Sequence, residues 1–320
     1  FSGNVFVYID YRKGPGIELV GPWDELVGEK ISNHPFDEHY MMSLVADEDQ
    51  KRFHEIIVEM ENRKEKNATL EFRNKTKRFW IECEARVSYD EKGNPIDKII
   101  AFKDITRVKA KNEELIYLAY YDSLTGLFNR NYFVKNLRDM CERAENEKAS
   151  VELLFLDIDE FKKINDSLGL LFGDELVQDF ALLIKEFQNE NIVAGRFGSD
   201  VFCVAIYDPC GQRSADNMYR QIRERLRTPF ILTNKAEISF SVSGGVAEFP
   251  EAGRTALELI KNAEIVLFKA KEKGKNNIQY FEHDILRNFM KTVSLEQRLK
   301  EAIDNEDFIV YYQPQFSART

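Results

Sequence analysis

The chain has 320 residues, of which 43% are hydrophobic, and a formal net charge of −10, so it can form two or three domains with sizeable cores. The acidic balance argues against nucleic-acid or anionic-membrane binding, because a phosphate surface requires a basic face. The four cysteines show no metal-type spacing, and no apolar run reaches the ~20 residues that span a bilayer. We therefore expect reduced thiols in a cytoplasmic protein, with no membrane contact in this segment.

Both ends of the sequence look as if they were cut within a longer sequence. The chain opens on the strand-like FSGNVFVYID without an initiator Met, and it closes on YYQPQFSART without a terminating helix. We expect a piece of a larger protein, whose remainder could carry a membrane anchor.

Residues 1–106 are predicted to form short strands and turns. FVYID and IELV flank a Lys-Gly-Pro-Gly turn, and residues 79–87 alternate between apolar and polar side chains, as a half-buried strand does. A Gly93-Asn94-Pro95 turn then leads into the strand IDKIIAFKDI, and VADED precedes a helix earlier in the segment. This segment resembles a PAS sensor domain, which implies an antiparallel sheet with helices; its ligand is unknown.

A charged helix is predicted from Thr106 to about Ala119, and we assign residues 107–120 to a linker or signalling helix. Val108 and Leu115 lie one heptad apart, which is too short a pattern to identify a coiled coil. A solvated linker and a dimerising helix are both open interpretations.

Residues 121–282 alternate between strand and helix patterns, which predicts an α/β domain on a mainly antiparallel sheet. VELLFL at 151–156 is a continuous apolar strand, and two apolar runs flank Gly198-Ser199-Asp200 as a hairpin. Helices are predicted at 174–189 and 255–273, followed by the short strand NIQYF. A further helix at 284–304 is predicted to lead into a strand at 308–316.

Two carboxylates lie where a palm-type sheet builds a metal site. Asp157 follows the apolar strand directly, and Asp200 lies in the hairpin turn. Carboxylates are the hard oxygen ligands that Mg²⁺ prefers, and such metals bridge substrate phosphates. Asn165 and Asp174 could together bind a guanine edge, since a carboxylate accepts hydrogen bonds and an amide both accepts and donates them. Gly198 would allow the backbone to approach a substrate closely.

Six motifs in one order make the family recognisable: YDSLTGLFNR, DIDEFKKIND, Gly173-Asp174, RFGSDVF, SVSGGVA and FKAKEKGKN. This segment resembles the GGDEF domains, the diguanylate cyclases. The resemblance implies that two GTP molecules condense into cyclic di-GMP between two protomers, each 3′-hydroxyl attacking the partner's α-phosphate. We therefore expect GTP as ligand and a homodimer through the PAS, helix and GGDEF segments.

The resemblance also assigns roles to single residues. It implies that Asp157, the Ile158 carbonyl and Asp200 bind Mg²⁺ or Mn²⁺, and that Asp200 is catalytic. It places the substrate against Asn165, Asp174, Gly198, Lys162, Lys271 and Lys275, with the lysines at phosphate positions. Lys275 replaces the usual arginine, which keeps the charge but weakens bidentate phosphate contact.

The signature itself departs from the family pattern. Gly198-Ser199-Asp200-Val201-Phe202 replaces Gly-Gly-Asp/Glu-Glu-Phe, so Val201 removes a carboxylate implicated in metal binding and catalysis. Leu170 replaces a common histidine. The family's inhibitory RxxD site falls on Asn189 and Ile192, so we expect no product inhibition of that kind.

The C-terminal segment SLEQRLKEAIDNEDFIVYYQPQF resembles the start of an EAL phosphodiesterase domain, whose catalytic motifs are absent. We assign residues 283–320 to a linker helix and this truncated start. The leading hypothesis is a PAS sensor coupled to a degenerate GGDEF domain that binds GTP and regulates the downstream EAL domain. The alternatives are a weak diguanylate cyclase and a scaffold that binds no nucleotide.

Overall fold

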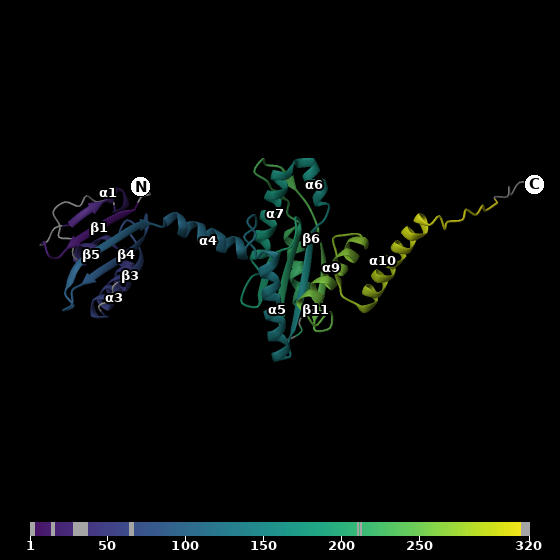
Figure 1. Cartoon of the computed structure of the whole chain (residues 1–320). Coiled ribbons are helices and arrows are strands. Elements are labelled where there is room, and N and C mark those ends of the chain that lie inside the picture. Colours follow the sequence, from purple (N-terminus) through teal and green to yellow (C-terminus); the bar gives the residue numbers. More distant parts are fainter. Residues whose placement is uncertain are drawn as a thin grey trace, which may run out of the picture. The chain divides into compact units, whose positions relative to one another are not determined.

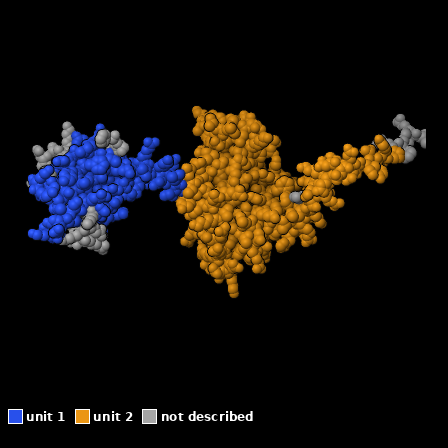
Figure 2. All heavy atoms as spheres, in the orientation of Figure 1, with its two compact units in different colours: residues 1–116 blue, residues 117–320 orange. Residues whose placement is uncertain are grey.

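The computed structural model describes residues 4–13, 17–27, 38–63, 67–209, 211 and 213–314. The chain divides into two compact units, Phe1–Ile116 and Tyr117–Thr320, which are coloured separately in Figure 2. Each unit has its own sheet and its own hydrophobic core.

Unit 1 is an antiparallel sheet in the order β2-β1-β5-β4-β3, with helices between β2 and β3. The predicted alternation is confirmed in β4, where Ile81, Cys83 and Val87 are buried and Glu84 and Arg86 are exposed. The elements are β1 (Val5–Asp10), β2 (Ile17–Val20), α1 (Trp23–Val27), α2 (Glu38–Leu44), α3 (Asp47–Arg63), β3 (Asn67–Arg73), β4 (Trp80–Tyr89) and β5 (Pro95–Asp104).

The charged helix after unit 1's sheet is confirmed as α4 (Thr106–Tyr120), and none of its residues is buried. Val108, Leu115 and Leu118 expose apolar side chains on it. Cys83, Cys141 and Cys203 are free and buried, as expected for reduced thiols. The turn at 14–16 and Cys210 lie outside the described residues.

The sheet of unit 2 has the order β12-β11-β6-β8-β7, and only the β11–β12 pair is parallel. The predicted α/β architecture is therefore confirmed. The elements are α5 (Arg130–Glu147), β6 (Ser150–Ile158), α6 (Phe161–Leu168), α7 (Leu170–Lys185), β7 (Ile192–Arg196), β8 (Val201–Asp208), α8 (Ser214–Arg225), β9 (Phe230–Ile231), β10 (Glu237–Ile238), β11 (Val242–Phe249), α9 (Ala256–Glu272), β12 (Ile278–Tyr280) and α10 (His283–Asp304).

Helices cover both faces of this sheet, which Figure 1 shows around β6 and β11. Side chains of a strand alternate between faces, so Leu154 and Leu156 pack with α7 and α8, whereas Leu153 and Phe155 pack with α5 and α9. β6 is thus buried on both sides, which explains its unbroken apolar sequence.

Two predictions of secondary structure were wrong, the start of one helix and the presence of a C-terminal strand. The helix expected from residue 174 begins at Leu170, because Gly169 at φ 94° separates it from α6, and Gly173 and Asp174 lie in its first turns. No strand forms at 308–314, the described part of the strand expected at 308–316, because no described strand pairs with it. In the part of the chain that the structure describes, no helix is both long and apolar enough to cross a membrane.

Candidate functional site

Asp157 lies on a sheet face beside two neighbouring strands. β6 continues through Ile158, so Asp157 is still within the strand and pairs with Val201 of β8 and Ser243 of β11. Its side chain shares a face with Phe155, two residues earlier, and α9 covers that face. The carboxylate therefore lies under the C-terminal part of α9.

Lys271 of α9 forms an ion pair with Asp157, with Nζ 2.6 Å from Oδ2. The other oxygen, Oδ1, is buried and has no hydrogen-bond partner among the described residues. Burial raises the pKa of Asp157 to about 6; Lys271 opposes this shift, whereas Asp200 and Asp159 add to it. Half of this carboxylate is thus available to a further ligand.

Hydrogen bonds from Arg196 and from the backbone of β6 fix the hairpin turn that carries Asp200. The Arg196 guanidinium donates to the Ser199 carbonyl at 2.7 Å and forms an ion pair with Asp122 at 3.1 Å. The backbone N–H of Ile158 donates to the Asp200 carbonyl at 3.2 Å, which ties the turn to β6. Ser199 Oγ donates to Asp200 Oδ1 at 2.6 Å, so the serine uses one oxygen of the candidate catalytic carboxylate.

Val201 is the cross-strand neighbour of Asp157 and projects on the same sheet face. With Phe197 it packs against the apolar cluster beneath α5 and α9. A glutamate at this position would lie beside Asp157, whereas valine presents a methyl surface there. This geometry follows from the strand register and could not be read from the sequence order alone.

Asp159 has a structural role that sequence analysis missed. Its buried carboxylate accepts hydrogen bonds from Ser241 Oγ and Ser243 Oγ, both at 2.6 Å, and from the Asn276 backbone N–H at 3.0 Å. These bonds join the end of β6 to the start of β11 and to the loop after α9. Ser241 and Ser243 are two residues apart, a spacing that places both on one strand face and could have suggested a shared partner.

The predicted guanine residues lie on two adjacent helices. Asn165 of α6 lies so close to Gly173 of α7 that a Cβ on Gly173 would be 1.8 Å from Asn165 Oδ1. Asn165 Oδ1 is buried without a hydrogen-bond partner among the described residues, and Asp174 is exposed one residue beyond Gly173. Gly173 is therefore required for the Asn165 side chain to occupy this place.

The three predicted phosphate lysines have different surroundings. Lys271 pairs with Asp157, and Lys275 pairs with Glu160. Lys162 is exposed, and no ion pair involves it within the described ranges. Gly198 is exposed and has space for a Cβ, the nearest atoms being those of Val201 at 3.7 Å, so this structure sets no requirement for glycine there.

Comparison with known proteins identifies the fold that carries this site. The family described as "Diguanylate cyclase, GGDEF domain" matches residues 119–277. The chain contains a GGDEF domain. The isolated GGDEF domain of TpbB from Pseudomonas aeruginosa has a similar structure, with 28% identity, a TM-score of 0.52, and coverage of 53% of this chain and 99% of that chain.

Longer proteins are also similar to this chain. "Signaling protein YkoW" of Bacillus subtilis is 33% identical over 231 residues, which are 72% of this chain and 29% of the relative. "Cyclic di-GMP phosphodiesterase PdeR" of Escherichia coli is 34% identical over 226 residues, 71% of this chain and 34% of the relative. The chain thus spans about a third of the length of these relatives, and some relatives are named as phosphodiesterases.

The residues present fit a divalent metal of the kind that GGDEF domains generally use. Among the described residues, Asp157 Oδ1 is a buried oxygen without a hydrogen-bond partner. Asp200 is near enough to raise the pKa of Asp157, and the Ile158 carbonyl follows it in the chain; both are further hard oxygen ligands. No group of three or more His, Cys, Asp or Glu side chains gathers to hold a metal in the described residues. Two carboxylates and one carbonyl would leave several positions of Mg²⁺ for water and phosphate oxygens.

Replacing Asp157 with asparagine should stabilise the metal-free domain at pH 7.5. The folded pKa of about 6 exceeds the ordinary value of 3.8, so the folded state holds this proton more tightly, and stability falls as pH rises from about 4 to 6. Asparagine avoids this loss, which is on the order of 2–3 kcal/mol. Thermal unfolding in EDTA at pH 7.5 and pH 4 should show a gain only at the higher pH.

Asp159→Asn is the matched control, because Asp159 is equally buried but accepts three hydrogen bonds. We expect it to destabilise the domain at pH 7.5. A loss of stability in Asp157→Asn of the same size at both pH values would show that the carboxylate is held as a favourable ion pair rather than as a desolvated charge.

Proposed function

We propose that this chain is a sensory segment of a cyclic di-GMP signalling protein whose GGDEF domain binds GTP with Mg²⁺ but condenses it poorly or not at all. The carrying observation is Val201 beside Asp157 on one sheet face, where the family signature would place a second carboxylate. The bound nucleotide would then act as a signal to the rest of the protein rather than as a substrate.

The binding part of the proposal is supported by two buried groups for which the structure describes no hydrogen-bond partner. Asn165 Oδ1 and Asp157 Oδ1 are both buried without hydrogen bonds in the described residues, and such groups destabilise a fold unless a ligand or water satisfies them. Asn165 and Asp174 would bind guanine, while Lys162, Lys271 and Lys275 would contact the phosphates. Asp157, the Ile158 carbonyl and Asp200 would hold the metal, which would neutralise phosphate charge.

Side chains of the protein would position the site and contact the phosphates. The Arg196 bonds to Ser199 and Asp122 hold the turn of Asp200 in place before the nucleotide arrives. Lys271 would contact phosphate oxygens when the site is filled, and before that its ion pair compensates part of the charge of Asp157. With Val201 at the fourth signature position, no second carboxylate is available to stabilise the charge that develops during phosphoryl transfer.

Calorimetric titration with GTP and Mg²⁺ tests this proposal. We expect saturable binding to the native chain, and at least about tenfold weaker binding in Asp174→Ala, because a carboxylate that accepts guanine N–H groups forms charge-assisted hydrogen bonds. Asp179→Ala is the control, since Asp179 lies on the same helix and has the same chemistry outside the proposed site. ATP should bind more weakly than GTP.

Absence of saturation at millimolar GTP would contradict the proposal and favour the scaffold interpretation. Equal effects of Asp174→Ala and Asp179→Ala would show that Asp174 contributes only general charge. The matched pair on one helix separates these outcomes without depending on any catalytic activity.

A weak diguanylate cyclase is the second candidate, because Asp157 and Asp200 are both retained and one oxygen of Asp157 accepts no hydrogen bond from the residues that the structure describes. Formation of cyclic di-GMP by the native chain that rises with the square of protein concentration and is lost in Asp157→Ala would favour it. Such kinetics follow from a reaction between two protomers.

The organisation around the GGDEF domain completes the proposal. The antiparallel sheet and helices of unit 1 support the assignment of residues 1–106 to a PAS sensor. The exposed apolar side chains of α4 support a homodimer through residues 107–120, together with the PAS and GGDEF domains, residues 121–282. We propose that residues 283–320 lead into an EAL phosphodiesterase, which relatives named as phosphodiesterases support.

A further inference from the structure

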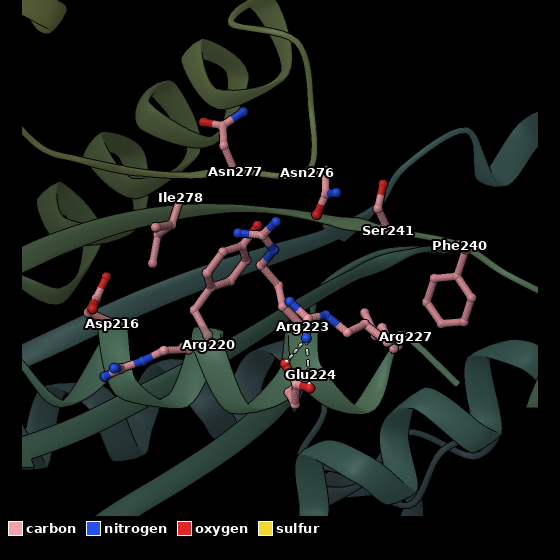
Figure 3. Close-up of a pocket in the computed structure, with 12 residues that line it drawn as sticks. Asp216, Arg220, Arg223, Glu224, Arg227, Phe240, Ser241, Asn276, Asn277 and Ile278 are labelled. Atoms are coloured by element: carbon pink, nitrogen blue, oxygen red, sulfur yellow. Dashed lines mark hydrogen bonds and ion pairs between the residues drawn. The ribbon is translucent and has the colours of Figure 1, made fainter. Parts of the chain in front are cut away.

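A pocket of about 520 Å³ lies between α8 and the segment that leads into β12. This volume falls within the range of small-molecule sites. Figure 3 shows its lining: arginines stand along α8, and the side chain of Arg223 points across the pocket toward the segment with Asn276. Phe240 forms an apolar wall, fixed by ring contacts with Phe180 and Phe230 at 5.8 and 5.2 Å between centroids.

Three arginines reach this pocket because of their spacing. Arg220, Arg223 and Arg227 are three and four residues apart and therefore share one face of the helix and its C-terminal extension. Arg227 forms an ion pair with Glu224 at 2.8 Å. For Arg220 and Arg223, no carboxylate partner is found among the residues that the structure describes, although Asp216 also lines the pocket. In a chain of net charge −10, this is a local excess of positive charge.

The opposite wall is a loop held in an unusual backbone conformation. Gly274, Lys275 and Asn276 have successive positive φ angles of 111°, 61° and 47°. The Asn277 amide fixes this loop by donating to the carbonyls of Ala270 and Lys275, at 2.7 and 2.9 Å. The side-chain amide of Asn276 lines the pocket, and no hydrogen bond uses it within the described part of the chain.

This pocket is separate from the candidate nucleotide site. None of the residues proposed to bind metal or nucleotide lines it. Residues of α8 pack on the sheet face of Leu154 and Leu156, which α7 also covers, whereas Asp157 and Lys271 lie on the face covered by α9. The two places are close in the chain: Asn276 follows Lys275 directly, and Ser241 and Asn276 line the pocket and both bind Asp159, two residues after Asp157.

We propose that this pocket binds a small molecule that carries a phosphate or diphosphate group. Arg223 and Arg220 would bind the phosphate oxygens, since guanidinium groups bind phosphate through two parallel hydrogen bonds. The Asn276 amide would donate a further hydrogen bond, and Phe240 and Ile278 would contact any apolar part of the ligand. This inference does not depend on GTP binding at the site around Asp157.

The test is a calorimetric titration of the whole chain with inorganic diphosphate in EDTA and low salt. We expect the dissociation constant to rise about tenfold or more in Arg223→Gln, and by less in Arg223→Lys, which keeps the charge but loses the bidentate geometry. Arg225→Gln is the matched control. Arg225 lies on the same helix but pairs with Glu186 at 3.4 Å and does not line the pocket, so its effect should stay below about twofold.

Diphosphate titration of Lys271→Gln shows whether diphosphate binds in the α8 pocket or at the nucleotide site. Diphosphate binding that survives this change and fails in Arg223→Gln supports the α8 pocket, even if GTP does not bind the chain. Binding that fails only in Lys271→Gln would place the anion at the nucleotide site and overturn the proposal. It would also be overturned by equal losses in Arg223→Gln and Arg225→Gln, or by no binding at millimolar diphosphate. Stronger binding of ADP than of diphosphate, again lost in Arg223→Gln, would identify the ligand as a nucleotide.

Discussion

Replacing Val201 with glutamate is expected to raise cyclic di-GMP formation by about a hundredfold to a thousandfold, which corresponds to roughly 3–4 kcal/mol of transition-state stabilisation. Val201 pairs directly with Asp157 across two strands, and both side chains share a sheet face. A glutamate there would add a second acidic side chain beside the buried Asp157 Oδ1, which has no hydrogen-bond partner in the described part of the chain. The measurement is product formation from GTP with Mg²⁺ and then Mn²⁺, followed by chromatography and mass detection.

Val201→Gln is the matched control, because glutamine is polar and has nearly the size of glutamate but carries no charge. Product from Val201→Glu but not from Val201→Gln would assign the gain to the carboxylate. If the native chain forms product at the rate of Val201→Glu, two carboxylates suffice and the proposed loss of catalysis is wrong. If neither forms product although GTP binds, another departure, such as Ser199 or Leu170, limits the reaction.

The same substitution has a consequence that does not depend on activity. Two neighbouring carboxylates on a half-buried face repel each other, so Val201→Glu should be less stable than the native chain without metal. Mg²⁺ should restore much of that loss in Val201→Glu and much less in Val201→Gln. Thermal unfolding with and without Mg²⁺ therefore confirms folding of the variant before its activity is interpreted.

Replacing Gly245 with alanine should lower the free energy of unfolding of unit 2 by about 3 kcal/mol or more, because helix α9 packs directly on β11 at this residue. A Cβ on Gly245 would lie 2.4 Å from the Leu267 nitrogen and 2.5 Å from the Ala263 oxygen. These are helix backbone atoms, so they cannot move away by a change of rotamer. The helix that carries Lys271 would have to shift as a whole.

Gly244→Ala is the control, because Gly244 faces the other side of the sheet. Its Cβ would meet only side-chain atoms, at 3.2 to 3.4 Å, and we expect a loss of about 1 kcal/mol. Urea unfolding followed by far-UV circular dichroism reports both units. Both tryptophans, Trp23 and Trp80, lie in unit 1, so tryptophan fluorescence should not change in either variant. Equal effects of the two substitutions would show that α9 is not held against Gly245.

Much of this fold could be predicted because single segments determine it locally. β6 is a continuous apolar run, β4 alternates, and α9 begins after Thr255, whose hydroxyl accepts from the Glu258 N–H as an N-cap. The start of α7 could not be placed, because it depends on the backbone conformation of Gly169 rather than on an apolar period. A strand at 308–316 could not be assessed from its own residues, because a strand forms only where another strand pairs with it.

The sequence predicts which residues form the candidate site, but it could not predict their pairings. The motif order identifies Asp157, Asn165, Asp174 and Asp200, whereas the structure shows that Lys271 binds Asp157 and that Asp159 binds two serines and a loop. The contacts of Asp159 join residues that lie 82 to 117 positions apart, and Asp157 and Lys271 are 114 positions apart. No local sequence pattern therefore contains these contacts. The requirement for Gly173 likewise follows from a neighbour on another helix.

The ion pair between Lys271 and Asp157 means that the site carries its own counter-ion. A divalent ion that binds Asp157 exchanges one cation for another, so Lys271 compensates part of the buried charge before any metal binds. Metal and nucleotide then act as reversible ligands of an already folded domain. In a cell, their concentrations would change how often the site is filled.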